Sequence, residues 1–325
     1  MIRILVPLLL VTQPAWAETP DVVTDITPIQ SLAARVMEGV GTPDVLLPAG
    51  TDVHHHSLTI SNANALTGAE LVIWVGPQLT PWLSEPIATL VTNATQIALT
   101  ETSDWGSLEL RHEHGDKAHE EDEHAEHADE EHETEEHHED KHEDDTHGND
   151  TREGTAIDPH GWLNPQIASI WMDQIADALA QQDPVNADIY LANAAAGKSE
   201  MMLLSKEITA MLTELNERKF ILPHDGYQYF EQRFGLEPEA FITDSDAHEP
   251  GPAHIAELRD IMLNEDVACV FTDREVNPSW ATVLLEGTDA KTTFLDTSID
   301  EDSPISQAYA VMIRRIAVNF AACLS

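Results

Sequence analysis

The chain has 325 residues, with 59 acidic and 16 basic side chains, so its formal net charge is −43 when histidine is counted as neutral. A charge of this sign repels phosphate, which excludes a nucleic-acid binder that depends on a general basic surface. The 17 histidines are a second unusual feature, because they outnumber all lysines and arginines together. A length near 300 residues predicts one large or two medium domains, each able to form a core.

Residues 1–17 have the pattern of a cleavable export signal. Arg3 supplies a positive charge, residues 4–11 form an apolar run, and residues 15–17 read Ala-Trp-Ala. The run is far shorter than the ~20 residues of a membrane-spanning helix. An N-terminal core strand is the alternative interpretation. No cysteine lies near the cleavage pattern, so we expect an exported protein without a lipid anchor.

The chain contains two cysteines, Cys269 and Cys323. In an exported protein, two cysteines most simply form one disulfide, and two buried free thiols are the alternative. Their wide spacing argues against a metal-binding pair or a redox C-x-x-C motif.

The first part of the chain alternates predicted strands and helices. Strands are expected at 21–26, 44–48 and 69–76, with a helix over 28–39 and another after the histidines at 54–56. The run at 69–76 is continuously apolar, as is typical of a buried parallel strand. This βαβα order predicts a parallel sheet flanked by helices.

Residues 111–150 form a highly charged insert with 19 acidic residues, three basic residues and ten histidines. Its composition cannot bury a core, so we expect it to be disordered without a ligand. One interpretation is a solvated loop with no role. The other is a set of weak sites for divalent cations, formed by the carboxylates with His112, His114, His119, His124, His127, His132, His137, His138, His142 and His147.

The remainder of the chain predicts a long helix followed by a second α/β unit. Asn164-Pro165 begins a helix to about 182, and Asp183-Pro184 begins a longer one to about 218. The expected fold is therefore α/β, with two lobes that each contain a short parallel sheet flanked by helices, joined by one long helix. The expected boundaries are 18–182 for the first lobe, 183–218 for the linking helix and 219–325 for the second lobe. Within the second lobe we expect strands at 220–223, 268–272 and 292–296 and helices at 227–234, 255–264 and 306–323.

Three histidines outside the insert share a context. His54, His160 and His224 each lie just beyond a predicted strand or in a loop that enters a helix, where ligands gather at the carboxyl edge of a parallel sheet. Asp296 ends a predicted strand of the second lobe. Three neutral imidazoles with a carboxylate or a water suit tetrahedral Zn²⁺ and disfavour Ca²⁺ and Mg²⁺. His248 and His254 are expected to be surface residues.

Several motifs occur in order along the chain: Leu46-Leu47-Pro48-Ala49-Gly50, His54-His55-His56-Ser57-Leu58, Asp158-Pro159-His160-Gly161-Trp162, Pro223-His224-Asp225-Gly226-Tyr227, Glu249-Pro250-Gly251 and Phe294-Leu295-Asp296. Together they resemble the zinc-specific solute-binding proteins of ABC importers, the ZnuA family. The two cysteines and the acidic, histidine-rich insert also match a branch of that family.

The resemblance implies that His54, His160 and His224 bind zinc in the cleft between the lobes. Ser57-Leu58 sets the register that selects His54, with His55 or His56 as alternatives. Some relatives have a glutamate immediately before the first histidine, where this chain has Val53, so Asp296 or a water is expected as the fourth ligand.

The implied function is that of a monomeric periplasmic carrier, not an enzyme, which delivers Zn²⁺ to an inner-membrane ABC permease. Its lobes are expected to move little on binding, and its insert is expected to collect or sense zinc. A zinc buffer or chaperone without a permease is one alternative. A zinc hydrolase is the other, and it would need a general base beside the metal and a substrate pocket.

Overall fold

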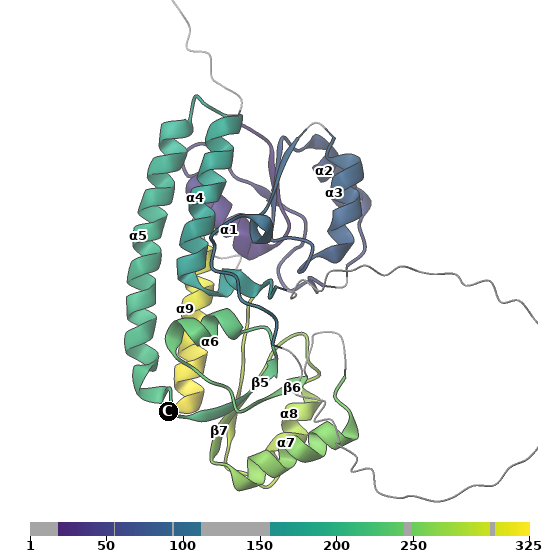
Figure 1. Ribbon diagram of the computed structural model, residues 1–325, viewed down its shortest axis with the longest axis vertical. Coiled ribbons are helices and arrows are strands. Elements are labelled where there is room, and N and C mark those ends of the chain that lie inside the picture. Colours follow the sequence, from purple (N-terminus) through teal and green to yellow (C-terminus); the bar gives the residue numbers. More distant parts are fainter. Residues whose placement is uncertain (1–18, 55, 93, 112–156, 244–248, 300–302) are drawn as a thin grey trace, which may run out of the picture.

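The structure is a computed structural model that describes residues 19–54, 56–92, 94–111, 157–243, 249–299 and 303–325 (Figure 1). Two parallel four-stranded sheets form its two lobes, and helices pack around each sheet. This is the predicted two-lobe α/β architecture. Among the residues that the model describes, no helix combines the length and apolar character needed to cross a bilayer.

The sheet of the first lobe has the strand order β2-β1-β3-β4, and all its strand pairs are parallel. Its strands are β1 (Val22–Thr24), β2 (Asp44–Val45), β3 (Leu71–Trp74) and β4 (Thr95–Ala98). The helices that alternate with them are α1 (Thr27–Val36), α2 (Ile60–Gly68) and α3 (Ser84–Leu90). The sequence did not predict β4 or α3.

The sheet of the second lobe repeats this arrangement in the order β6-β5-β7-β8, again with parallel pairs. Its strands are β5 (Lys219–His224), β6 (Ala240–Thr243), β7 (Val267–Thr272) and β8 (Lys291–Phe294). The helices that alternate with them are α6 (Gln228–Phe234), α7 (Pro252–Asn264) and α8 (Ser279–Leu285). Here β6 and α8 were not predicted.

The three longest helices in the described part of the chain are α4 (Pro165–Gln182), α5 (Ala187–Leu212) and α9 (Ile305–Leu324). Helix α4 packs against α1 and β3 of the first lobe, whereas α5 and α9 contact elements of both lobes. Helix α4 has the predicted bounds, whereas α5 is shorter than expected at both ends. Its start is delayed because the Asp183 carboxylate accepts hydrogen bonds from Asn186 and from the Tyr190 hydroxyl, at 2.6 and 2.9 Å, which organises a turn between the two helices. A short 3-10 turn, Thr213–Leu215, follows its end.

Helix α9 follows the second sheet in sequence but packs against α1 and α5. The Ser31 hydroxyl of α1 donates to the carbonyl of Ile305 at 2.5 Å and accepts the backbone N–H of Tyr309 at 2.8 Å. The buried Tyr309 hydroxyl in turn donates to the carbonyl of Trp162 at 2.8 Å. The last helix therefore ties the two halves of the chain together.

The core divides by sheet face. On β3, Leu71 and Ile73 point into a large cluster that α4, α5 and α9 share with both lobes, whereas Val72 points to a smaller cluster on the outer face. On β5, Phe220 faces the shared cluster and Ile221 faces a separate outer cluster. Successive side chains of a strand point to opposite faces, so these sheets are buried on both sides. Because the lobes share one core, hinge motion between them would disrupt close packing.

Candidate metal site

His160 begins the 3-10 turn His160–Leu163, which leads from the insert into α4. The buried Asp158 carboxylate accepts the backbone N–H of His160 at 2.9 Å, and the same oxygen lies 2.8 Å from the ring Nδ1. A carboxylate on Nδ1 fixes the ring and leaves Nε2 as the nitrogen that can bind a metal. The following residue, Gly161, has no room for a side chain, because a Cβ there would lie 2.7 Å from the Trp105 ring.

His224 is the last residue of β5 and is buried. Its Nδ1 lies 2.8 Å from the carboxylate of Asp273, which directly follows β7, the neighbouring strand. The hydroxyl of Tyr227 donates to that same carboxylate at 3.3 Å. Nε2 of His224 is again the nitrogen left for a metal. Gly226 lies so close that a Cβ on it would be 2.3 Å from Nε2.

His54 lies in the loop that follows β2. Its backbone N–H donates to the Asp52 carboxylate at 2.9 Å, and the Trp82 indole N–H donates to the carbonyl of Val53 at 2.9 Å. The ring centroids of His54 and His160 are 5.7 Å apart, and those of His160 and His224 are 6.3 Å apart. Imidazoles bound tetrahedrally to one Zn²⁺ at ~2.0–2.1 Å would have ring centroids about 5 Å apart. The fold therefore brings these three histidines nearly to metal-binding separation.

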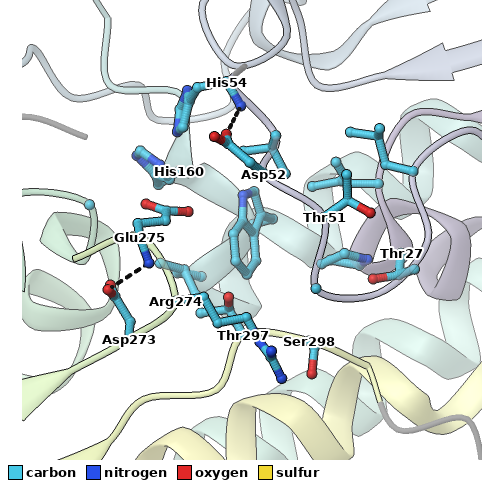
Figure 2. Close-up of a pocket in the computed structure, with 18 of the residues that line it drawn as sticks. Thr27, Thr51, Asp52, His54, His160, Asp273, Arg274, Glu275, Thr297 and Ser298 are labelled. Atoms are coloured by element: carbon cyan, nitrogen blue, oxygen red, sulfur yellow. Dashed lines mark hydrogen bonds between the residues drawn. The ribbon is translucent and has the colours of Figure 1, made fainter. Parts of the chain in front are cut away.

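The three histidines line one cavity of about 240 Å³. Figure 2 shows His54, His160 and Glu275 at one end of this cavity, with Thr27 and Ser298 towards the other. The Oε2 atom of Glu275 is 3.2 Å from Nε2 of His224. Among the described residues, one set of three metal-ligating side chains has ligand atoms that all lie within 4.8 Å of one another. It consists of His224, Asp273 and Glu275.

Asp296 follows β8 but makes its contacts outside this cluster. Its carboxylate accepts the backbone N–H and the hydroxyl of Ser298 at 3.0 and 2.6 Å, and it lies 3.4 Å from Arg315 and 3.8 Å from Arg274. The residues that line the cavity include its neighbours Thr297 and Ser298. The role of Asp296 as a metal ligand stays a prediction.

Arg111 links the lobes beside this site. Its guanidinium pairs with the buried Glu231 carboxylate, with Nη1 2.8 Å from Oε2, and with Asp225, which follows His224 in sequence. The guanidinium carbon also lies 4.8 Å from the centre of the Phe241 ring. Burial raises the pKa of Glu231 to about 7, although Arg111 acts in the opposite direction.

Sequence reasoning missed the carboxylates that orient the two buried histidines. Asp158 stands two residues before His160, and Asp273 directly follows a predicted strand, so both positions offered a signal. Neither stood out in a chain with 59 acidic residues. Glu275 offered no comparable signal, because it lies three residues beyond Thr272, the last residue of the strand.

The remaining predicted residues have different outcomes. Cys269 and Cys323 form a disulfide with a Cα–Cα distance of 5.7 Å, as predicted. Nε2 of His254 lies 3.0 Å from the carbonyl of Phe241, outside the cavity lining. His56 packs edge-on against the Trp82 ring. His55, His248 and the ten histidines of the insert lie outside the described residues, as does an H-E-x-x-H pattern at 138–142.

Comparisons with known proteins identify the family of this chain. The family described as "Zinc-uptake complex component A periplasmic" matches residues 22–323. The high-affinity zinc uptake system protein ZnuA of Paracoccus denitrificans is 41% identical over 312 residues, which cover 96% of this chain and 94% of that protein. A crystal structure of ZnuA superposes with a TM-score of 0.72 at 21% identity and covers 94% of this chain and all of the other. The periplasmic zinc binding protein TroA from Treponema pallidum gives a TM-score of 0.72 at 17% identity, over 94% and 99% of the two chains. The chain therefore belongs to the ZnuA family, the periplasmic component of zinc-uptake complexes.

Proposed function

We propose that this protein captures Zn²⁺ in the cleft between its lobes and delivers it, as a periplasmic monomer, to an ABC-type zinc importer. The observation that carries the proposal is the convergence of His54, His160 and His224 on one cavity from three separate segments. A carboxylate oxygen lies 2.8 Å from Nδ1 of each of the two buried histidines, so their Nε2 atoms can face one cation together with the His54 ring. The relative from Paracoccus denitrificans and the matching family both carry zinc uptake in their names.

The donor set supports zinc as cargo. Neutral imidazoles bind Zn²⁺ well, whereas Ca²⁺ and Mg²⁺ require oxygen ligands. The expected fourth ligand is a carboxylate, for which we predicted Asp296, or a water. The signal-like residues 1–17 support export, and the family is described as periplasmic.

Equilibrium competition with a zinc chelator tests the site. His160→Ala and His224→Ala should each weaken zinc binding by orders of magnitude. His254→Ala is the matched control, because its ring contacts a backbone carbonyl away from the cavity. Equal affinities for all three variants would show that the site assignment is wrong.

Two further experiments test delivery and the insert. A strain that lacks the protein should grow poorly under zinc starvation, and unchanged growth would favour a zinc buffer without a permease. Calorimetry on a variant lacking residues 112–150 should retain one tight site and lose several weaker ones. This deletion keeps Arg111, which pairs with Asp225 and Glu231. Loss of the tight site with the insert would contradict the proposed cleft site.

A further inference from the structure

The carboxylate best placed to complete the cleft site is that of Glu275. We propose that Glu275 supplies a carboxylate oxygen as the fourth zinc ligand beside the three histidines, an inference that rests on the proposed function. The loop after β7 thus contributes both a ligand and, through Asp273, the residue that orients His224.

The distance joins the two atoms that would share the metal. Because Asp273 lies against Nδ1 of His224, the metal-binding nitrogen is Nε2, and Oε2 of Glu275 lies 3.2 Å from it. Two ligand atoms of a tetrahedral zinc site with bonds of ~2.0–2.2 Å are separated by roughly 3.3 Å. The observed separation therefore matches one edge of such a site. Figure 2 shows the Glu275 carboxylate directed towards His160 as well.

A turn fixes the position of Glu275. One carboxylate oxygen of Asp273 accepts the backbone N–H groups of Glu275 and Val276, each at 3.1 Å. The other oxygen lies against Nδ1 of His224. Hydrogen bonds of an aspartate to N–H groups two and three residues later stabilise a tight turn. The same side chain therefore sets the orientation of the histidine and of the glutamate.

Asp296 is already engaged by other groups. Its carboxylate accepts two hydrogen bonds from Ser298, and Arg315 donates to its backbone carbonyl at 3.1 Å and approaches its carboxylate. Both oxygens of the Asp296 carboxylate are thus engaged away from the cluster that contains His224 and Glu275. The Oε2 atom of Glu275, by contrast, already lies 3.2 Å from the metal-binding nitrogen of His224.

A carboxylate in this position has a consequence for metal preference. Oxygen ligands suit Mn²⁺ better than imidazole nitrogens do, whereas Zn²⁺ binds well to three imidazoles and a water. Removal of the Glu275 carboxylate should therefore weaken both metals but widen the preference for zinc over manganese.

The test compares Glu275→Gln with Asp296→Asn in the full-length chain. Zn²⁺ and Mn²⁺ affinities are measured by chelator competition, and the visible absorption of bound Co²⁺ reports the ligand set. Glu275→Gln should weaken Zn²⁺ binding at least ~10-fold, in line with the ~10–100-fold losses seen when groups around a metal site are removed. It should also weaken Mn²⁺ binding by a larger factor and change the Co²⁺ spectrum. Asp296→Asn should leave both metal affinities within about threefold of those of the parent protein and the Co²⁺ spectrum unchanged, because Asp296 lies outside the cluster.

The opposite pattern overturns the inference. Unchanged affinities and an unchanged Co²⁺ spectrum in Glu275→Gln would exclude Glu275 as a ligand, and losses in Asp296→Asn alone would assign that role to Asp296. His160→Ala, measured in parallel, separates the two levels of the argument. If it loses zinc while Glu275→Gln does not, the proposed cleft site stands and only the assignment of Glu275 falls. If both variants keep tight binding, the cleft site and the fourth ligand fall together.

Discussion

Gly226 lies against the metal-binding edge of His224, and adding one methyl group to it should impair zinc binding. In Gly226→Ala the new Cβ would lie 2.3 Å from Nε2 and 2.7 Å from Cδ2 of His224. The histidine cannot easily move, because its side chain is 5% exposed and its Nδ1 is held 2.8 Å from Asp273. Overpacking of this kind costs ~1–3 kcal/mol. If the strain is relieved by turning His224 away from the metal, affinity should fall by roughly 5- to 150-fold.

The matched control is Gly68→Ala. A Cβ at Gly68 meets no heavy atom within 4 Å, and this residue ends helix α2, where alanine is well tolerated. Both variants are measured by chelator competition, with thermal unfolding of the zinc-free proteins as a check of folding. Gly226→Ala that is folded and binds zinc within threefold of the parent protein would refute the reasoning that space beside His224 is required.

Three further predictions concern stability. Arg111→Ala should destabilise the zinc-free protein by about 2 kcal/mol at pH 8, because the buried Glu231 carboxylate loses its cation, and by less at pH 6, where Glu231 is protonated. Equal losses of unfolding free energy at the two pH values, measured by chemical denaturation, would contradict this. Burial raises the pKa of Asp25 to about 7, despite hydrogen bonds from the backbone N–H groups of Val75 and Ile26, and it raises the pKa of Glu231 to about 7 as well. The folded state therefore binds more protons than the unfolded state between pH ~4 and ~7. These two groups should make zinc-free stability fall as pH rises through that window, and Asp25→Asn with Glu231→Gln should flatten the fall; an unaltered slope in the double variant would exclude them as its cause. Replacing Cys269 and Cys323 together by serine should lower the free energy of unfolding by roughly 4 kcal/mol, the value expected for a closed loop of this length. Zinc affinity should not change at a temperature where the variant stays folded, and a weaker affinity there would show that the disulfide shapes the site.

The sequence predicted the four central strands, β1, β3, β5 and β7, whose residues are mostly buried. The apolar runs that contain β3 and β7 are continuous, because each strand packs against the shared core on one side and an outer cluster on the other. The sequence also predicted the edge strands β2 and β8. The edge strands β4 and β6, which contain exposed or partly exposed residues such as Thr95 and Ala240, were missed. The missed helices α3 and α8 have seven residues each, too few for a clear helical period.

The site was predictable to the extent that it follows strand ends. His224 ends β5, and β5 lies beside β7. The residues at the carboxyl ends of these two strands therefore lie close together at one edge of the sheet. Within the described residues no strand leads into His160, and its position depends on Asp158 and on the packing of Gly161 against Trp105. The contact between Glu275 and His224 depends on a turn geometry that residue spacing does not encode.

The most direct test of the account is a crystal structure of the zinc-loaded protein. The account predicts one zinc ion in the cleft, with Nε2 atoms of His54, His160 and His224 at ~2.0–2.1 Å and an oxygen of Glu275 at ~2.0–2.2 Å. Asp296 should keep its contacts with Ser298 and Arg315. Tightly bound zinc away from these histidines, or held by fewer than two of them, would contradict the central claim.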